Sequence, residues 1–348
     1  MVKDNYFDER NIKNLQQIEG ILQQLPYFCR DYFVGIEQRT SALTRLNYAY
    51  DLRIFFNYIF NVVHLGKLEN FEISSLNHIS ASIIENYLGY LSYYKDENNK
   101  IKTNSLTAKA RKLATLKSFF KYFYNKDKLS ENVASKVSMP KIKDKAIIRL
   151  EVDEVVKLLD SVESGDNLTK KQISYHSRTK IRDVAIMTLF LGTGIRISEL
   201  VGINVENIDF SNSSFKITRK GGNEVILYMS TEVLEAMYDY YCERCCKENE
   251  NLNNNAFFLS LQKTRLTVRA VEMLVKKYSS LAIPLKKITP HKLRSTYGTN
   301  LYRETNDIYV VAEVLGHSDI NTTKRHYAAI SEDIKRNASR KITLREKK

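Results

Sequence analysis

The chain has 348 residues, of which 43% are hydrophobic, 27% are charged and only four are prolines. This composition excludes a disordered protein, and the length exceeds the usual size of one hydrophobic core, so we expect an ordered, mainly helical protein of two domains. The formal net charge of +14 favours a polyanionic partner, with nucleic acid as the commonest and an anionic membrane surface as the competitor.

Apolar patterning argues against the membrane alternative. The longest apolar stretch, residues 184–191, is far shorter than the roughly 20 residues that a spanning helix needs. Residues 1–17 are charged throughout and contain neither an apolar core nor a cleavage pattern for secretion. We therefore expect a cytoplasmic protein with no membrane partner.

Residues 1–136 are predicted to form a helical, DNA-binding bundle. Apolar periodicity predicts helices over residues 8–25, 38–63, 78–95 and 104–126. In the last of these, helical spacing groups six apolar residues as the core-facing side: Leu106, Ala110, Leu113, Leu116, Phe120 and Phe123. Polar side chains share the opposite side: Arg111, Thr115, Ser118 and Tyr122.

Charge is concentrated around this fourth helix. Residues 100–128 contain nine Lys or Arg and a single acid, Asp127. A solubilising surface would explain a charge run, but the local excess favours contact with phosphate groups. The candidate DNA-contacting residues are Arg111, Thr115, Ser118 and Tyr122 together with Lys117 and Lys121.

A basic linker is predicted over residues 137–149. Residues 136–149 hold five basic residues, one acid and one proline, with no amphipathic period. Lys141 and Lys143 in this segment could follow a nucleic-acid backbone and let two domains close around a duplex. The predicted second domain is then residues 150–330, followed by a tail, 331–348.

The second half is predicted to be mostly helical with a small antiparallel sheet. After an acid-rich helix start near residue 150, residues 165–180 are expected as an exposed loop and residues 181–194 as a buried helix ended by glycine. Two β-rich runs joined by a Gly-Gly turn predict a hairpin over residues 213–229. Further elements follow in chain order: a helix over 231–246, a strand-like 256–260 and a helix over 268–282.

The cysteines give only a weak indication of metal binding. Cys242, Cys245 and Cys246 form a C-x-x-C-C cluster with helical spacing, and Cys29 stands alone. A structural zinc site needs four ligands, and no second pair lies at a suitable spacing. Reduced thiols on a helix are the preferred interpretation, and no metal is assigned.

Two motifs in the second half could present cations to a phosphate. In "LGTGIRISEL", Gly192 and Gly194 end a buried helix and Arg196 follows in a tight turn, from which its guanidinium could be aimed. In "ITRKGGN", Lys220 lies at the mouth of the hairpin turn, where a lysine is more often simply exposed.

Two further motifs lie near the C-terminal end. In "TPHKLR", Thr289 is a natural N-cap and Pro290 a natural first helical residue, which places His291 and Arg294 one turn apart on an anion-attracting helix start; a capped helix with two polar surface residues is the alternative. In "EVLGHSDINTTKRHY", Gly316 ends a helix before His317, and Tyr327 follows ten residues later beside His326.

Taken together and in this order, the motifs resemble the tyrosine recombinase (phage integrase) family, most closely its Xer-like bacterial members. The resemblance implies a SAM-like helical core-binding domain followed by the catalytic domain. It also implies that Tyr327 attacks a DNA phosphodiester to give a 3′-phosphotyrosine. The implied catalytic set is Arg196, Lys220, His291, Arg294, His317 and Tyr327.

Roles for these residues follow from the same resemblance. The two arginines would neutralise the transition state, and Lys220 would protonate the leaving 5′-oxygen. Either the cationic pocket would stabilise the phenolate or a base would take the phenol proton, a role that suits His291. His317 would hydrogen-bond a phosphate oxygen or buttress the site. No cofactor, divalent metal or ATP is implied. One departure from the family pattern is that Tyr327 lies one residue farther from His317, which leaves the role of His326 open.

The implied partner is double-stranded DNA carrying a specific recombination site, bound by a tetramer on two sites. The basic tail, residues 331–348, would pack on a neighbouring protomer, or would be a frayed end that only attracts phosphate. The biological role would be resolution of chromosome dimers, or integration and excision of a phage or conjugative element. Two alternatives keep related chemistry or fold: a DNA-binding protein that does not cut, and a relaxing topoisomerase.

Overall fold

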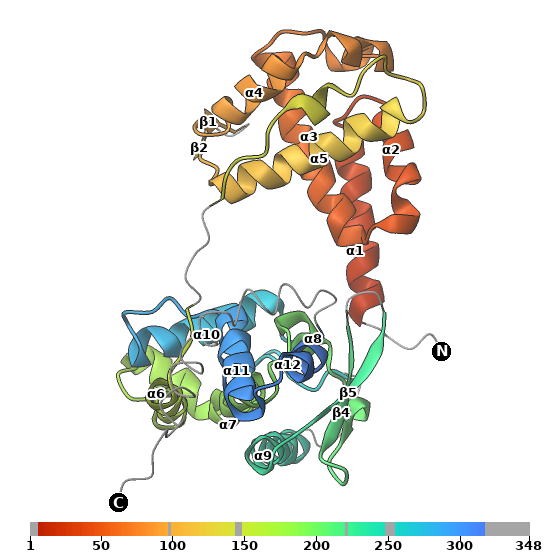
Figure 1. The fold of residues 1–348 in the computed structure, drawn as a ribbon. Helices are drawn as coiled ribbons and strands as arrows, with labels where there is room; N and C mark the ends of the chain where they lie inside the picture. Colours follow the sequence, from red (N-terminus) through yellow and green to blue (C-terminus); the bar gives the residue numbers. More distant parts are fainter. Residues whose placement is uncertain (1–5, 97–98, 143–147, 220–221, 248–254, 317–348) are drawn as a thin grey trace, which may run out of the picture. The chain divides into compact units, whose positions relative to one another are not determined.

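The computed structural model describes residues 6–96, 99–142, 148–219, 222–247 and 255–316. The chain divides into two compact units, Met1–Lys145 and Ala146–Lys348 (Figure 1). The division falls inside the segment predicted as a linker. Both units are dominated by helices, so the predicted mainly helical class with small antiparallel sheets is confirmed.

The first unit is built from five helices, with four short 3₁₀ turns among its described residues. The helices are α1 (Tyr6–Leu22), α2 (Cys29–Gly35), α3 (Ala42–Asn61), α4 (Ala81–Tyr90) and α5 (Leu106–Tyr124). Strands β1 (Tyr94–Lys95) and β2 (Ile101–Lys102) form a small antiparallel hairpin, with Tyr94 opposite Lys102. The side chains of Ser41, Ser80 and Ser105 accept hydrogen bonds from the first turns of α3, α4 and α5, which fixes where these helices begin.

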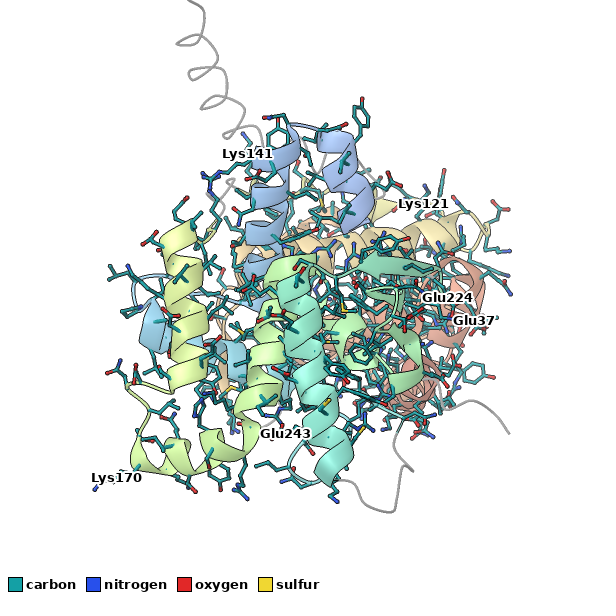
Figure 2. All side chains as sticks on the ribbon, turned by 90° about the horizontal axis from the view of Figure 1, so that it is seen from below. Glu37, Lys121, Lys141, Lys170, Glu224 and Glu243 are labelled. Carbon is teal, nitrogen blue, oxygen red and sulfur yellow. The ribbon has the colours of Figure 1, made fainter. Side chains whose placement is uncertain are left out.

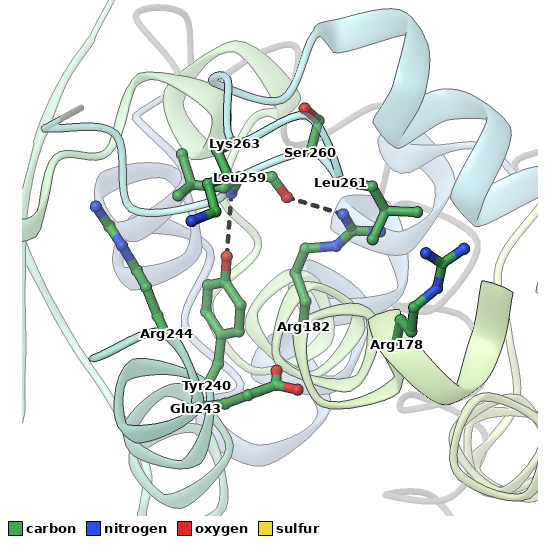
Figure 3. A pocket seen from close by; sticks show the side chains of 9 residues that line it. All are labelled: Arg178, Arg182, Tyr240, Glu243, Arg244, Leu259, Ser260, Leu261 and Lys263. Atoms are coloured by element: carbon green, nitrogen blue, oxygen red, sulfur yellow. Dashed lines mark hydrogen bonds between the residues drawn. The ribbon is translucent and has the colours of Figure 1, made fainter. Parts of the chain in front are cut away.

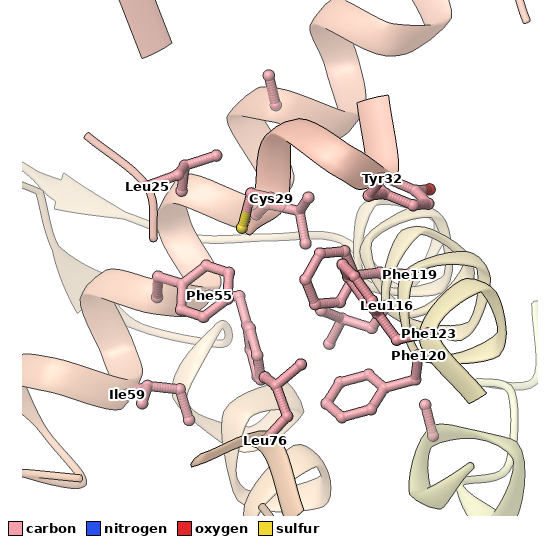
Figure 4. Close-up of a cluster of buried hydrophobic side chains, with 14 of the residues drawn as sticks. Leu25, Cys29, Tyr32, Phe55, Ile59, Leu76, Leu116, Phe119, Phe120 and Phe123 are labelled. Atoms are coloured by element: carbon pink, nitrogen blue, oxygen red, sulfur yellow. The ribbon is translucent and has the colours of Figure 1, made fainter. Parts of the chain in front are cut away.

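An aromatic core holds these helices together (Figure 4). Phe55 on α3 and Phe119, Phe120 and Phe123 on α5 are buried against one another, with ring centroids of Phe119 and Phe123 5.1 Å apart. The sequence-based prediction for α5 is right for its apolar side except at Leu106, which is 53% exposed because it lies in the first turn, where the helix extends beyond the core. Helix α2 escapes prediction, because seven residues are too few to show a period.

The second unit contains seven helices among the described residues. They are α6 (Val152–Ser164), α7 (Lys170–Thr193), α8 (Ile197–Gly202), α9 (Thr231–Lys247), α10 (Val268–Ala282), α11 (Pro290–Thr305) and α12 (Ile308–Leu315). Strands β3 (Ile208–Asp209), β4 (Ser214–Thr218) and β5 (Glu224–Tyr228) pair antiparallel in that order. The predicted hairpin is therefore confirmed, with Lys216 opposite Ile226.

Helix α7 begins earlier than predicted. The sequence predicts a loop over residues 165–180, but the helix starts at Lys170 after a capping box made by Thr169 and Gln172. The face that the first turns of α7 bury is polar, with His176 and Thr179 inside, so the apolar periodicity that marks a buried helix is missing there. A polar but buried face can be recognised only once its partners are known.

Helix α11 is central to the second unit because it packs against both α7 and α12. The hydroxyl of buried Thr296 accepts a hydrogen bond of 3.0 Å from the backbone N–H of Leu150, and Arg303 pairs with Glu151 at 3.2 Å. The start of the unit is thereby fixed to the helix that carries His291 and Arg294. No helix in the described parts of the chain is long and apolar enough to cross a membrane.

Candidate active site

Arg196 is held in place by the turn between α7 and α8. Helix α7 ends at Thr193, and its C-cap Gly194 has a left-handed φ of 62° that suits glycine. Arg196, two residues after Gly194, is the N-cap of α8. The buried carboxylate of Glu199 accepts from the backbone N–H of Arg196 at 2.8 Å and from its Nη1 at 2.8 Å. Glu199 thus holds both the backbone and the guanidinium of Arg196, whose side chain stays 33% exposed.

Arg294 and His291 lie one turn apart on α11, as predicted. Pro290 is the first helical residue and Thr289 occupies the N-cap position, although the Thr289 side chain makes no capping hydrogen bond. Arg294 is only 6% exposed, and its Nη1 donates to the carbonyl of Gly194 at 2.5 Å. His291 is exposed at the start of α11, where the positive end of the helix dipole favours an anion.

The two arginines meet at the C-terminal end of α12. Nη2 of Arg196 donates to the carbonyl of Gly316 at 2.8 Å, and Nη2 of Arg294 donates to the carbonyl of Leu315. Two residues far apart in the chain are therefore brought to adjacent carbonyls, because α12 ends where α8 and α11 begin. Guanidinium groups are suited to bind phosphate oxygens, so two of them held together are a candidate phosphate site.

A third guanidinium reaches the same helix end. Arg219 follows β4, and its Nη2 donates to the carbonyl of Val314 at 2.7 Å while Nη1 donates to that of Glu313 at 3.3 Å. Burial lowers the pKa of Arg219; Glu199 opposes this shift and the charge of Arg196 adds to it. Arg219 and Glu199 are not among the residues predicted from the sequence. Glu199 could have been found, because it stands three residues after the N-cap as in a capping box.

Several predicted site residues lie outside the described residues. Lys220, His317, Tyr327, His326 and Lys143 belong to this group, as does the tail 331–348. Sequence alone places Lys220 directly after Arg219, and His317 directly after Gly316. Their neighbours in the chain are thus the residues that take part in the arginine cluster at the end of α12.

A tyrosine inside the described site is poorly suited to attack. Tyr297 on α11 packs with Val311 and Leu315 of α12, and burial raises the pKa of its phenol. A raised pKa lowers the fraction of phenolate, which is the nucleophilic form. The residue therefore acts as packing between α11 and α12.

In the first unit, Arg111 and Thr115 are used for internal bonding. Both bond to the buried carboxylate of Asp51 on α3: Arg111 through its two Nη atoms, the longer hydrogen bond being 2.8 Å, and Thr115 through its hydroxyl at 3.0 Å. Lys112, also buried, pairs with the same carboxylate at 2.8 Å. Thr115 is fully buried, so the predicted outward face of α5 is wrong at this residue; the helical pattern could not reveal an acid 64 residues away.

Three other predicted residues line a groove between α2 and α5. Ser118, Lys121 and Tyr122 border a cavity of about 510 Å³ together with Gly35, Ile36, Arg39, Thr40, Asn125 and Lys126. The Ser118 hydroxyl accepts from Tyr32 at 2.8 Å and the Tyr122 hydroxyl donates to the carbonyl of Asp31 at 2.9 Å, so both support the groove wall. We call this cavity with Arg39, Lys121 and Lys126 the basic groove. Arg39 and Lys126 are not among the predicted residues.

The remaining predicted lysines lie at the surface to different degrees. Lys121 and Lys141 are exposed (Figure 2), whereas Lys117 is half-buried on α5. Lys141 lies at the end of the described first unit, within the segment predicted to follow a DNA backbone.

A separate pocket in the second unit is not part of the arginine cluster (Figure 3). Its volume is about 320 Å³ and its lining includes Arg178, Arg182 and Tyr240. Arg182 donates to the carbonyl of Leu259 at 2.8 Å, and the Tyr240 hydroxyl accepts from the Leu259 N–H at 3.0 Å. These bonds fix the 255–260 segment to α7 and α9, which indicates a structural role.

The three cysteines whose side chains the structure describes form no disulfide. Cys29 is buried in the aromatic core, where burial raises its pKa, while Cys242 is half-buried and Cys245 exposed on α9. The side chain of Cys246 lies outside the described residues.

The model of the Phage integrase family matches residues 149–333. Tyrosine recombinase XerC of Caldanaerobacter subterraneus subsp. tengcongensis is 34% identical over 305 residues, which cover 84% of this chain and 80% of the relative. Tyrosine recombinase XerS of Streptococcus mutans is 28% identical, and the alignment covers 94% of this chain and 98% of that protein.

Solved structures share the fold. The XerH site-specific recombinase bound to a palindromic difH substrate matches with a TM-score of 0.61 and 20% identity, over 86% of this chain and 80% of that one. A lambda integrase dimer bound to a COC′ core site matches with a TM-score of 0.59 and 16% identity, over 86% and 93%. The family match spans more than half of the chain and contains the whole arginine cluster. The chain therefore belongs to the phage integrase family, as a Xer-like tyrosine recombinase.

Proposed function

We propose that this protein is a site-specific DNA recombinase that cuts and rejoins strands through a 3′-phosphotyrosine intermediate. The observation that carries the proposal is the meeting of Arg196 and Arg294 at the carbonyls of Gly316 and Leu315, in a chain of this family. Two guanidinium groups fixed by the protein's own backbone are preorganised for the charge that develops on a phosphodiester under attack. His291, one turn before Arg294, lies at the same helix start.

In this mechanism Tyr327 is the nucleophile. Its phenolic oxygen forms a bond to phosphorus while the bond from phosphorus to the 5′-oxygen breaks, and the energy of the ester is kept for rejoining. His291 takes the phenol proton and Lys220 gives a proton to the departing 5′-oxygen. His317 contacts a phosphate oxygen. All of these atoms belong to the protein and the DNA, so neither ATP nor a divalent metal has a step in the scheme.

DNA binding would use both units. In the first unit, the basic groove and the exposed Lys121 and Lys141 offer cations to the phosphate backbone, supported by the net charge of +14. Arg111 contributes through its exposed part, since its side chain remains 47% exposed while paired with Asp51. Lys117 and Lys143 extend the same basic surface in the proposal.

Assembly and biological role are further parts of the proposal. The protein would act in the cytoplasm as a tetramer on two DNA sites, with residues 331–348 packed on a neighbouring protomer. The similarity to relatives named XerC and XerS supports resolution of chromosome dimers. Integration and excision of a mobile element uses the same chemistry and is the second candidate.

Capture of the covalent adduct tests the chemistry and reveals the DNA site. Labelled fragments covering the genome that encodes the protein are incubated with it, and adducts are separated on a denaturing gel and sequenced. We expect an adduct that forms equally well in EDTA and is lost in Tyr327→Phe. Tyr309→Phe is the matched control, because Tyr309 is 61% exposed on α12, and it should retain the adduct.

Contrary outcomes separate the alternatives. An adduct that persists in Tyr327→Phe would place the nucleophile elsewhere, and DNA binding without any adduct would favour the non-cutting regulator. Arg196→Ala and Arg294→Ala should bind the captured site yet cleave about 10²–10³-fold more slowly at saturating DNA. A loss of binding alone, with the rate at saturation unchanged, would remove their role in the transition state.

A further inference from the structure

Arg219 joins two segments that are far apart in the chain. Its guanidinium donates to the carbonyls of Val314 and Glu313 at 2.7 and 3.3 Å, residues that lie 95 and 94 positions later. Its backbone N–H donates to the carbonyl of Asn223 at 2.8 Å, which closes the base of the hairpin turn. The end of the β4–β5 hairpin is thus attached to the last turn of α12 through one side chain.

The fit around Arg219 is close. A Cβ on Gly316 would lie 2.1 Å from Nη1 of Arg219, so the guanidinium occupies space that only glycine leaves open. The φ of Gly316 is 60°, which also favours glycine. Nε of Arg219 is buried without a hydrogen-bond partner among the residues that the structure describes. Arg219 as a whole is half-buried, and its hydrogen bonds to α12 compensate for the loss of water around part of the guanidinium.

The attachment matters because of the next residue in the sequence. Lys220 follows Arg219, and a peptide unit limits the distance between their Cα atoms to about 3.8 Å. Without a tie, a lysine at a hairpin tip would sample many positions. With Arg219 bonded to α12, the described chain that leads into Lys220 is tied to the helix end where Arg196 and Arg294 meet.

We propose that Arg219 is a positioning residue: it fastens the hairpin to the C-terminus of α12 so that Lys220 is held where it can protonate the departing 5′-oxygen. The proposal rests on the function proposed above. Arg219 touches neither the reacting phosphate nor the tyrosine in this scheme. It acts through Lys220, and its loss should therefore resemble the loss of a correctly placed general acid.

A change of leaving group separates positioning from general stability. The substrates are the captured recombination site with an ordinary phosphodiester and the same duplex with sulfur in place of the bridging 5′-oxygen. A thiol has a pKa of about 8.5, so it departs as the thiolate, with the bonding electron pair and without a proton. An alkoxide is far more basic and needs the acid. Adduct formation is measured in single turnover at saturating DNA.

Arg219→Ala should slow adduct formation on the oxygen ester by about 10-fold or more, as expected for a misplaced general acid, with unchanged affinity for DNA. The sulfur ester should recover most of this loss. Lys220→Ala should show the same pattern, and the double variant should be no slower than Lys220→Ala alone, because both act on one proton transfer. The rate of Arg219→Lys should lie between those of the wild type and Arg219→Ala, since one ammonium can replace only part of the hydrogen bonds that the guanidinium makes.

The control is Arg265→Ala. Arg265 also donates to main-chain carbonyls, of Val201 at 2.8 Å and Ile203 at 3.3 Å, so its replacement removes comparable bonds without touching the hairpin. The midpoint of thermal unfolding of Arg265→Ala should fall, but the ratio of its cleavage rates on the two esters should match that of the wild type.

Three results would overturn the proposal. They are an Arg219→Ala rate within twofold of the wild type, equal slowing on both esters, and multiplicative effects in the double variant. If the wild type itself forms no adduct on either ester, the proposed function fails, and this inference fails with it.

Discussion

The carboxylate of Glu199 accepts both the backbone N–H and the Nη1 of Arg196 at 2.8 Å, so a single buried acid fixes the start of α8 and the direction of the arginine. Glu199 is only 4% exposed. Its position explains how an arginine in a tight turn can be aimed at a phosphate without depending on its own rotamer preference.

Replacing Glu199 should impair cleavage more than DNA binding. Among the described residues, Glu199→Ala leaves the Arg196 guanidinium held only by the carbonyl of Gly316, and a misplacement of about 1 Å can reduce a rate about 10²-fold. Glu199→Gln should be milder, because its amide oxygen still accepts a hydrogen bond. The check is single-turnover adduct formation at saturating DNA. Glu206→Ala, at an exposed acid nearby, is the control and should match the wild type; equal rates in Glu199→Ala would contradict the aiming role.

Among the described acids of the first unit, Asp51 should be the one whose replacement destabilises the fold most. Its carboxylate is 1% exposed and pairs with Lys112, itself 6% exposed, and with Arg111. Removing one partner of a buried ion pair costs about 3–5 kcal/mol, because a buried charge is left unpaired. We expect Asp51→Ala to lower the free energy of unfolding by that amount in urea denaturation followed by circular dichroism.

The control for this measurement is Glu19→Ala, which breaks the exposed pair with Arg30 and should cost at most about 1 kcal/mol. If Asp51→Ala were no more destabilised than Glu19→Ala, the cluster around Asp51 would not support the fold.

The basic groove can be tested through the salt dependence of DNA binding. Removing one cation that binds a DNA phosphate should reduce the slope of log K against log salt concentration by about 0.9. We expect this reduction, with weaker binding at low salt, for Arg39→Ala, Lys121→Ala and Lys126→Ala, measured by fluorescence anisotropy. Lys67→Ala removes an exposed lysine away from the groove and should leave the slope unchanged. An unaltered slope in all three variants would exclude the groove from the DNA interface.

Two glycines should respond oppositely to alanine. Gly194 has a φ of 62°, and a Cβ there would lie 2.4 Å from the ring of Tyr297, so Gly194→Ala should destabilise the protein by about 1–3 kcal/mol. Gly20 lies within α1 with nothing within 4 Å of a new Cβ, so Gly20→Ala should stabilise by about 0.4–1 kcal/mol. Thermal unfolding of both variants provides the check, and a stabilised Gly194→Ala would show that the turn before Arg196 tolerates a side chain.

Much of the fold could be predicted, because local signals and tertiary structure agree in most elements. Helix α10 has the predicted bounds, since its N-cap Thr267 and its apolar period both mark it. Helix α7 is longer than its apolar pattern predicts, because the side chains buried by its first turns are polar. Such faces are stabilised by partners that lie elsewhere in the chain. His176, for example, is hydrogen-bonded to the carbonyl of Val162 at 2.8 Å.

The candidate site likewise contains residues that could be predicted from the sequence and residues that could not. Arg196, His291 and Arg294 could be predicted because each stands in a recognisable motif at a helix start. The outward direction predicted for Thr115 is wrong, because a helical period separates faces but does not say which polar face meets a buried acid. Arg219 could not be predicted at all, since its partners are carbonyl groups, which every residue carries.

Because the partners of Arg219 are main-chain carbonyls, this site can accept some sequence changes during evolution. Glu313 is exposed and Val314 is half-buried, yet both serve the cluster only through their main-chain oxygens. Mutational drift at these two side chains should be nearly neutral for recombination, provided that the helix persists. A survey that ranks positions by residue identity would pass over these two residues, although Arg219 depends on both.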